Sequence, residues 1–303
     1  MRVRRGASSS VLGWAGAAVL APAGLALAYL PARIGLWLGR RIGDLAWVLL
    51  RGRRAVVVEN LARAFGGQRA SSALTRVGRA SFEHLGMTLV EACVFFFRSP
   101  SVLLSRVEMR GVSHLDAAAA RGRGVLLLTA HYGNWELLAA SHALTRFALS
   151  VVVRPLDHPL LNRVVQRFRE RSGVELITRR RGLREVMDAL RRGRMVGILL
   201  DQNASRGTGV FAPFFGVPAA TSKSLAVISL RTGAPVIPVF IRRQPDGRHH
   251  VEIEPALPAP ADGDVVSYTA SFNQAIEAAI RRAPGQWFWL HRRWKTRPEE
   301  GPA

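Results

Sequence analysis

The heptapeptide "AHYGNWE", residues 130–136, places a histidine and an acid five positions apart. A carboxylate bonded to one ring nitrogen of an imidazole fixes its tautomer, so the other nitrogen can take a proton from a substrate hydroxyl. We therefore interpret His131 as a general base and Glu136 as the acid that orients it. Spacing alone leaves an alternative open, because a histidine that only caps a core strand gives the same pattern.

The motifs of several other chemistries are missing from the sequence. It contains no G-x-S-x-G elbow, no P-loop, no H-E-x-x-H and no paired C-x-x-C, and its single cysteine, Cys93, lies in an apolar run far from His131. The sequence therefore lacks the usual motifs of serine hydrolases, nucleotide-binding proteins and zinc sites. We expect a base without a nucleophile, a metal or a bound cofactor.

The elements around this motif alternate between strands and helices. The run "GVLLLTA", residues 124–130, is typical of a buried strand, residues 134–144 have helical periodicity, and Tyr132-Gly133-Asn134 forms the turn between them. Further strands are predicted at 149–155, 174–178, 195–201, 234–243 and 249–255, and further helices at 80–97, 158–173, 183–193, 221–233 and 265–284. This order predicts an α/β fold, a sheet flanked by helices, with ligands at the carboxyl ends of the strands. His131 is therefore expected at the mouth of the sheet.

The N-terminal region has the character of a membrane anchor. After the basic start "MRVRR", residues 11–32 carry no charge, which is about the length that spans a bilayer, and residues 33–54 form a tryptophan-bearing amphipathic segment. A cleavable signal peptide is the alternative, which the length of the apolar run disfavours. We divide the chain into an anchor with an interfacial helix, 1–69, and a catalytic domain, 70–303.

The composition is strongly basic. Lys and Arg number 43 against 21 Asp and Glu, a net charge of +22, and 49% of the 303 residues are hydrophobic, enough for a sizeable core. Such a charge favours a polyanionic partner, which can be a nucleic acid, an anionic membrane face or an acidic protein. Only Lys223 and Lys295 are lysines, so a general bias toward arginine explains the excess equally well.

Several longer motifs together resemble a known family. "RRAVVVENLARAF", "AHYGNWE", "LDQN", "GVFAPFFGVPAATSKSLAVISLRTGAPVIPVF" and "QWFWLHRRWKTRP" occur in the order seen in bacterial lipid A late acyltransferases, over residues 12–298 or nearly so. The resemblance implies the glycerophosphate-acyltransferase-like fold of the lysophospholipid acyltransferase superfamily, with His131 and Glu136 as the catalytic pair. One departure concerns the acid-Gln-acid triplet of many members, which reads Asp201-Gln202-Asn203 here. Any role of the second carboxylate is thus in doubt.

The resemblance also implies the reaction and its partners. A lipid A precursor hydroxyl would attack the thioester of an acyl carrier protein in a ternary complex, at the cytoplasmic face of the cell inner membrane, with no metal or cofactor and no nucleic acid as partner. The basic charge would serve to dock the acidic donor protein and anionic lipid. Coenzyme A as donor and another phospholipid or glycolipid as acceptor stay open. A non-enzymatic, membrane-tethered protein that binds lipid or nucleic acid is the alternative from a different class.

The remaining candidate residues suit such a reaction. Arg154 ends the strand 149–155 and is a candidate for binding phosphate or the oxyanion, together with the amides after Gly133. Arg169 and Arg171 end the helix 158–173 and are phosphate candidates too, although a solvated basic face is equally compatible. Asp201, Gln202 and Asn203 end another strand, where they could hold sugar hydroxyls or order an arginine.

Two aromatic clusters are candidates for apolar contacts. Phe211, Phe214 and Phe215 are expected to line an acyl groove, with core packing as the alternative. In "QWFWLHRRWKTRP" the tryptophans 287, 289 and 294 alternate with cations, a mixture that suits a membrane interface with anionic headgroups. A nucleic-acid surface could have the same composition.

Overall fold

A central mixed sheet organises the molecule. The computed structural model describes residues 22–66, 71–153, 166, 169, 171–178 and 182–298. The seven strands lie in the order β1-β9-β8-β2-β5-β3-β4; β8 and β9 are antiparallel and every other pair is parallel. The strands of the sheet are β1 (Val107–Arg110), β2 (Val125–Thr129), β3 (Leu149–Val153), β4 (Glu175–Thr178), β5 (Met195–Leu199), β8 (Val236–Arg243) and β9 (His249–Ile253). The predicted α/β sheet is confirmed.

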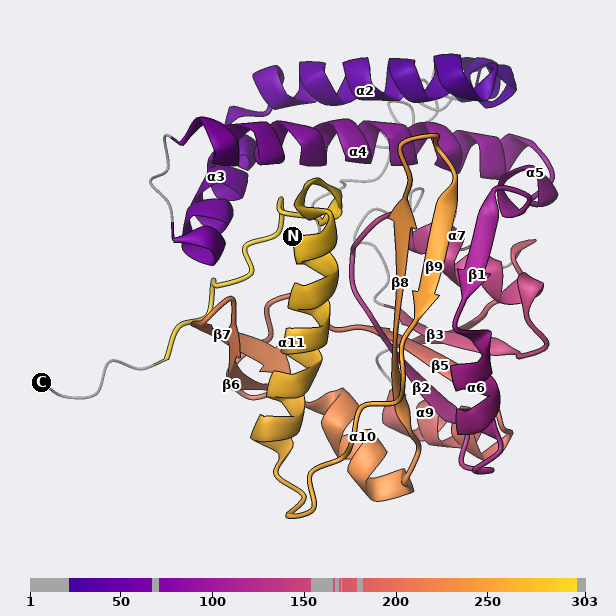
Figure 1. Ribbon diagram of the computed structural model, residues 1–303, viewed down its shortest axis with the longest axis vertical. Coiled ribbons are helices and arrows are strands. Elements are labelled where there is room, and N and C mark those ends of the chain that lie inside the picture. The colour runs from indigo at the N-terminus through magenta and orange to yellow at the C-terminus, as the bar shows by residue number, and fades with distance from the viewer. Residues whose placement is uncertain are drawn as a thin grey trace, which may run out of the picture.

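Helices cover both faces of this sheet, and a separate hairpin lies beside it (Figure 1). One face packs on α9 (Gly182–Arg191), α10 (Ser224–Thr232) and α11 (Val265–Arg282), and the other on α5 (Ser101–Leu104), α6 (Val112–Ala119), α7 (Trp135–Ala140) and the 3-10 turn η1 (Ser141–Leu144). The remaining elements are α2 (Ala32–Leu49), α3 (Arg51–Phe65), α4 (Ser72–Phe97), the hairpin strands β6 (Gly209–Phe214) and β7 (Val217–Ser222), and the 3-10 turn η2 (Pro284–Gln286). Strands β2 and β5 are buried almost throughout because both faces are covered, which explains their continuous apolar sequences.

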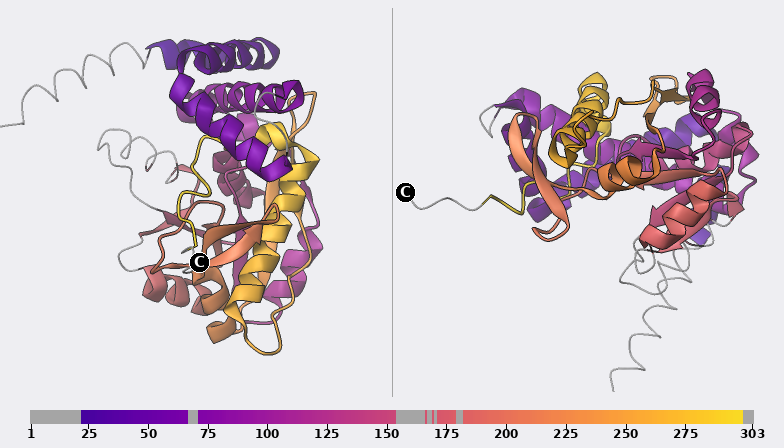
Figure 2. Two further views of the ribbon diagram at one scale, coloured as in Figure 1. Left: turned by 90° about the vertical axis from the view of Figure 1, so that its left-hand side faces the viewer. Right: turned by 90° about the horizontal axis from the view of Figure 1, so that it is seen from below.

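Helices α2 and α4 lie side by side at one end of the sheet (Figures 1 and 2). Glycines make this close approach possible. A Cβ atom on Gly86 of α4 would lie 2.1 Å from the carbonyl oxygen of Gly39, and one on Gly43 would lie 2.3 Å from that of Phe82. The buried glycines at positions 35, 39 and 43 recur every four residues, so they form one face of α2.

Helix α4 is apolar as well as long. In the described part of the chain it alone has the length and hydropathy of a helix that could cross a membrane, with half of its apolar window buried inside the molecule. A core helix passes the same test, and α4 does pack against α2 on one side. Of the predicted anchor, residues 11–32, the first eleven lie outside the described residues, and residues 22–29 are helical.

Most predicted elements are present, with some differences. Residues 221 and 222 belong to strand β7 and not to the following helix, because they continue the hairpin. The hairpin itself, strand β1 and helix α6 had no predicted counterparts. The predicted helix 158–173 lies mostly outside the described residues.

Candidate active site

The site begins where β2 and β5 end side by side. These strands pair in parallel, with Leu127 opposite Gly197 and Thr129 opposite Leu199. The backbone N–H of Leu200 then donates to the carbonyl of Thr129 at 3.0 Å, which continues the pairing past the last strand residues. Because alternate residues share a face, the next pair in this row is His131 and Asp201.

The tightest position of the turn after β2 can hold only glycine. Gly133 has a φ of +59°, and a Cβ atom there would lie 1.9 Å from the carbonyl oxygen of Ile241 on β8. Asn134 then caps α7, since its side-chain oxygen accepts from the N–H of Leu137 at 3.0 Å. The chain is thereby turned sharply from strand to helix between His131 and Glu136.

Asp201 holds His131 in place through two contacts. Its Oδ1 lies 2.8 Å from His131 Nδ1, and its Oδ2 accepts the backbone N–H of His131 at 2.9 Å. Trp287 Nε1 donates to the same Oδ2 at 2.8 Å. Burial by itself raises the pKa of the Asp201 carboxyl, but the charge of His131 and the hydrogen bonds of His131 and Trp287 outweigh it, so the pKa lies below its ordinary value.

His131 therefore has the orientation of a general base. With Nδ1 facing the Asp201 carboxylate, Nε2 is the ring nitrogen that can accept a proton, and its hydrogen-bond partner is the Gln202 amide nitrogen at 3.4 Å. The His131 side chain is 22% exposed whereas that of Asp201 is 2% exposed. A substrate can reach the imidazole, while the acid behind it is shielded from water.

The prediction that the Glu136 carboxylate bonds the His131 imidazole is wrong, because this carboxylate bonds Arg169. Both oxygens of Glu136 accept hydrogen bonds from Arg169, at 3.0 Å from Nε and 2.6 Å from Nη2. Glu136 lies in the first turn of α7, where the helix direction carries its side chain toward Arg169. The carboxylate that contacts the imidazole comes instead from the end of the neighbouring strand, 70 residues later.

A buried ionic cluster lies beneath the turn. Glu91 of α4 accepts from both terminal nitrogens of Arg243, the second at 2.7 Å, and its two oxygens also bond His249 at 2.9 Å and Asn134 Nδ2 at 2.7 Å. Sequence reasoning missed this cluster, because its members come from α4, β8, β9 and the turn. Its only signal in the sequence was an acid inside the apolar stretch "LVEACVFFF".

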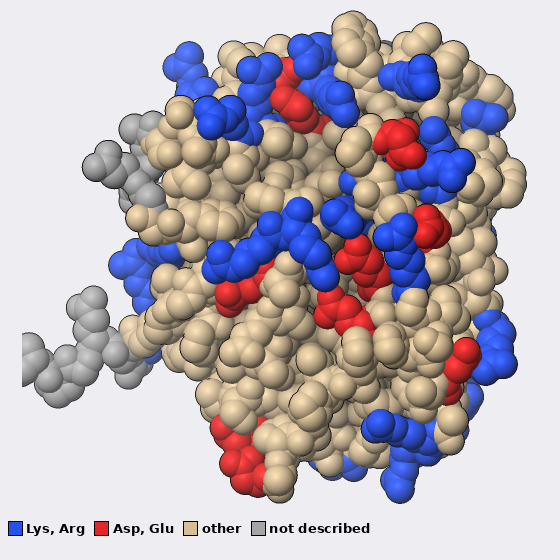
Figure 3. All heavy atoms as spheres, viewed as in Figure 1, with Lys and Arg blue, Asp and Glu red and all other residues tan. Residues whose placement is uncertain are grey.

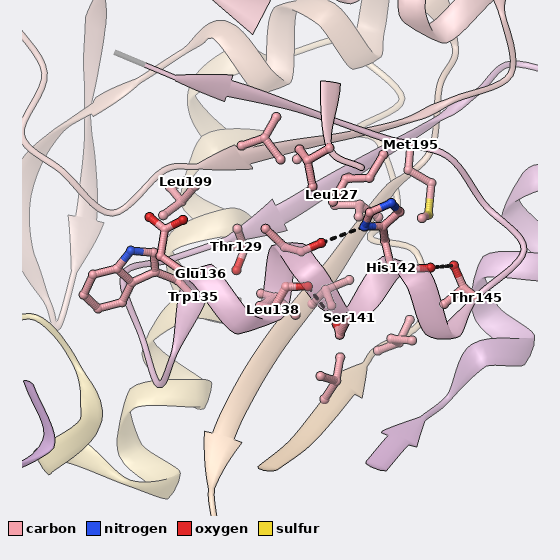
Figure 4. Close-up of a pocket in the computed structure, with 18 of the residues that line it drawn as sticks. Leu127, Thr129, Trp135, Glu136, Leu138, Ser141, His142, Thr145, Met195 and Leu199 are labelled. Carbon is pink, nitrogen blue, oxygen red and sulfur yellow. Dashed lines mark hydrogen bonds between the residues drawn. The ribbon is translucent and has the colours of Figure 1, made fainter. Parts of the chain in front are cut away.

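An apolar pocket opens beside the site, under α7 (Figure 4). Trp135 and Glu136 lie at one end and His142 and Met195 at the other, with Thr129 between them. The rest of the lining is mostly aliphatic and comes largely from the strands β1, β2, β3, β5, β8 and β9 and from α6 and α7. Such a shape suits a long hydrocarbon chain whose polar end remains near Glu136.

The predicted acyl groove is in a different place from this pocket. Phe214 is fully buried against Trp287 and Trp294, and Phe215 packs on Phe65 and Trp289. Neither they nor Phe211 line the pocket. Phe214 and Phe215 are therefore core residues, because β6 and β7 form a hairpin that is packed against α11 and the C-terminal tryptophans, while a groove role for the half-buried Phe211 stays a prediction.

The C-terminal tryptophans are core residues and not a membrane interface. Trp287, Trp289 and Trp294 are at most 4% exposed, and Arg293 between them is fully buried. The guanidinium of Arg293 donates to the Ala220 carbonyl at 2.8 Å and to Thr221 Oγ1 at 2.6 Å. The segment is therefore held inside the protein, with Trp287 supporting Asp201.

The other predicted site residues lie in different parts of the molecule. Arg154 lies outside the described residues. Arg171 donates to the Phe96 carbonyl at 2.5 Å, and Asn203 binds Thr296 in both directions, at 3.0 and 2.9 Å. The contacts of Arg171 and Asn203 join segments of the chain. Of residues 201–203, Gln202 is the exposed one, and it lies beside His131. No group of three or more metal-ligating side chains occurs in the described parts of the chain.

Comparisons with known proteins agree on one family. The model of the bacterial lipid A biosynthesis acyltransferase family matches residues 4–296. The chain is 31% identical to the lipid A biosynthesis lauroyltransferase of Escherichia coli, over 88% of this chain and 87% of the relative, and 32% identical to the palmitoleoyltransferase of the same organism, over 89% and 87%. A phosphatidylinositol mannoside acyltransferase of Mycobacterium tuberculosis is 29% identical, over 61% of this chain and 58% of that protein.

Proposed function

This chain belongs to the bacterial lipid A biosynthesis acyltransferase family and is an acyltransferase, and from that premise we propose that it moves a fatty acyl group from the thioester of an acyl carrier protein to a hydroxyl of a lipid A precursor. The observation that carries the mechanism is the contact between His131 Nδ1 and Asp201. It turns Nε2 away from the carboxylate, and the His131 ring contacts Trp135, which lines the apolar pocket together with Thr129 and Glu136. A base beside a hydrocarbon site is what acyl transfer to a hydroxyl requires.

His131 acts first as base and then as acid. Its Nε2 takes the proton of the acceptor hydroxyl as that oxygen attacks the thioester carbon. When the tetrahedral intermediate collapses, the C–S bond breaks and the imidazolium returns the proton to the leaving sulfur. Asp201 keeps the imidazole in the required tautomer and stabilises its charged form.

Glu136 acts through Arg169 and not by touching the imidazole. The pair lines one end of the pocket, with side chains 21% and 22% exposed, so it borders the position of the reacting carbon. We assign it the role of fixing the position of the Arg169 guanidinium against α7 at this end. The two hydrogen bonds of the pair fix the orientation of both side chains.

The acyl chain occupies the pocket under α7. The pocket residues on β5 run from Leu199 to Met195, four positions apart, or about 13 Å at roughly 3.3 Å per residue. That depth is on the scale of the dodecanoyl chain named for the lauroyltransferase relative. The reaction takes place at the cytoplasmic face of the inner membrane, where the acyl carrier protein and the lipid acceptor can meet.

Replacing the base tests this function. His131→Ala is expected to lower transfer of a dodecanoyl group from acyl carrier protein to a lipid A precursor by about 10²- to 10⁴-fold, with unchanged thermal unfolding. His114→Ala on α6 is the matched control and should transfer at the wild-type rate. Transfer by the His131 variant within threefold of wild type would remove His131 as the base. It would also be the result expected of a protein that only binds lipid.

The acceptor has a second candidate. The similarity to a phosphatidylinositol mannoside acyltransferase favours another glycolipid as a possible acceptor class. Mass spectrometry of lipids from a deletion strain, and from the same strain complemented with the wild type or His131→Ala, separates the two. Loss of one acyl chain from lipid A supports the first acceptor, and an unchanged lipid A with an altered glycolipid supports the second.

A further inference from the structure

One buried side-chain polar atom in the acyl pocket has no hydrogen-bond partner in the described structure. Thr129 is 7% exposed, lines the pocket, and its hydroxyl oxygen is buried without a partner. The other oxygen-bearing side chains of the lining are all bonded: Glu136 to Arg169, Ser141 to the Leu138 carbonyl and Thr145 to the His142 carbonyl. A buried hydroxyl that makes no hydrogen bond is disfavoured and calls for an explanation.

The position of this hydroxyl is defined by the strand that carries it. Thr129 precedes His131 by two residues and shares its face of the sheet, so the two are separated by about 7 Å along the strand. Figure 4 shows Thr129 between the Glu136 end of the pocket and Leu127, which lies farther in. The first carbons of an acyl chain that reacts beside His131 therefore pass next to Thr129.

A simple fatty acyl thioester offers a single oxygen in this region. The hydrocarbon tail can make no hydrogen bond, and the aliphatic lining deeper in the pocket matches it. The carbonyl at carbon 1 is the acceptor that a hydroxyl near the mouth can reach. We propose that Thr129 donates a hydrogen bond to the thioester carbonyl oxygen of the acyl donor, which makes it a catalytic residue; the proposal rests on the acyl transfer described above.

The contact gains strength as the reaction proceeds. Attack of the acceptor oxygen on carbon 1 moves an electron pair onto the carbonyl oxygen, while the hydroxyl proton goes to His131 Nε2. The Thr129 O–H then donates to an oxyanion, until the C–S bond breaks, the carbonyl reforms and the proton passes to the sulfur. A donor placed where negative charge develops stabilises the transition state more than the bound substrate.

Three variants of the full-length protein test the proposal, with dodecanoyl acyl carrier protein as donor and a lipid A precursor as acceptor. Thr129→Val keeps the shape but loses the hydroxyl, so kcat should fall by about 10²- to 10³-fold while the KM for the donor changes by less than about threefold. Thr129→Ser restores a hydroxyl and should stay within about tenfold of wild type. The control is Thr269→Val on α11, whose hydroxyl bonds the Val265 carbonyl at 2.7 Å; it should keep the wild-type kcat and lose thermal stability instead.

Thr129→Val should unfold at a temperature no lower than the wild type, because it removes a hydroxyl without a partner. The proposal is overturned if Thr129→Val has a wild-type kcat, if its loss lies in KM alone, or if the serine variant is as slow as the valine variant. It is also overturned if Thr129→Val slows transfer from a 3-hydroxydodecanoyl donor but not from a dodecanoyl donor. Thr129 would then contact the 3-hydroxyl of the acyl chain and not the thioester carbonyl.

A second measurement separates this proposal from the function on which it rests. The infrared stretch of a ¹³C-labelled thioester carbonyl should move to lower frequency when dodecanoyl acyl carrier protein binds the wild type or Thr129→Ser, and should move less with Thr129→Val. If the wild type shows this difference yet acylates no lipid A precursor, the proposed acceptor is wrong and the Thr129 contact stands. Equal frequencies in the wild type and the valine variant refute the contact.

Discussion

At the scale of single residues, the two acids near His131 make different contacts. Asp201 bonds the imidazole directly, whereas Glu136 reaches Arg169 and lines the pocket. The two acids therefore should respond differently to the loss of charge.

Asp201→Asn should lower kcat by about 10²- to 10⁴-fold, since an amide neither enforces the required tautomer nor stabilises the imidazolium. Glu136→Gln and Arg169→Met should each cause a smaller loss, and the double variant should be no slower than the slower single one, because the two residues act as a pair. The assay is steady-state transfer at fixed donor concentration. If Asp201→Asn were fully active and Glu136→Gln inactive, Glu136 and not Asp201 would support the base.

The lowered pKa of Asp201 also predicts how stability varies with pH. A carboxyl whose folded pKa lies below its unfolded value contributes stability above the unfolded pKa, which is near 3.8, and loses it as the pH falls through the folded pKa. The difference in free energy of unfolding between the wild type and Asp201→Asn should therefore be largest near neutral pH and shrink below pH 3.8. Urea titrations in detergent at several pH values measure it, and a constant difference would contradict the assignment.

At the scale of elements, contacts with α4, β8 and η2 fix the site. The turn of residues 131–136 is anchored to α4 by Glu91, and α4 in turn packs against α2 through glycines. Gly133 also donates its N–H to the Gln286 carbonyl at 3.0 Å, while the Gln286 side chain bonds the backbone of Arg243 in both directions. The turn is thus held from α4, β8 and η2 at once.

Glu91→Gln should destabilise the protein by about 3–5 kcal/mol, because it leaves the buried guanidinium of Arg243 without its counter-charge. Chemical denaturation followed by circular dichroism measures the loss. Glu59→Gln is the control: Glu59 is 46% exposed in its pair with Arg63 on α3, and its removal should cost at most about 1 kcal/mol. Equal effects of the two substitutions would mean that the buried cluster does not stabilise the fold.

Gly43→Ala should separate α2 from α4, because the added Cβ would meet the backbone of Phe82 at 2.3 Å. Backbone atoms cannot move aside as a flexible side chain can, so we expect a loss of about 1–3 kcal/mol. Gly52→Ala on α3 has no atom within 4 Å of the new Cβ and should be neutral or up to about 1 kcal/mol more stable. Thermal unfolding of both variants tests the contrast, and a neutral Gly43→Ala would contradict the close packing.

Charged side chains and exposed apolar side chains are distributed differently over the surface of the molecule. Figure 3 shows cations interspersed with acids over one face, so the net charge of +22 is not gathered there in one patch. By contrast, Ile34, Trp37, Leu45 and Val48 of α2 are between 50% and 59% exposed, and their spacing places them on one face. Its opposite face carries the buried glycines that meet α4. Such an amphipathic helix suits the surface of a bilayer.

Substituting serine for Trp37, Leu45 and Val48 in one variant should therefore weaken binding to anionic phospholipid vesicles at least tenfold. The reason is that each Å² of apolar surface buried in the bilayer stabilises the bound state by about 25 cal/mol. The measurement is vesicle co-sedimentation of a chain shortened to begin at residue 22, so that the full apolar segment 11–32 does not mask the effect. Serine at the exposed Leu183 and Val266, on α9 and α11, is the control and should leave binding unchanged. If the control weakens binding equally, α2 has no special role. The division into an anchor, 1–69, and a catalytic domain stays a prediction.

The sequence by itself determined most of the elements and the place of His131. Strand and helix periods are local properties, so the run 124–130, the turn at Gly133 and the helix after it could be read directly. The position of His131 at the end of a buried strand followed from these alone. The motif order also predicted the family, which the comparisons confirm.

Only the tertiary structure decided which side chains meet. Asp201 reaches His131 because β2 and β5 pair in parallel, and register between strands 70 residues apart is not written in a local pattern. For the same reason an acid five residues away was a plausible partner but the wrong one. The aromatic clusters illustrate the other limit: composition marks Phe214 and Trp289 as apolar, but whether such a side chain faces a ligand, a membrane or the core depends on what packs against it.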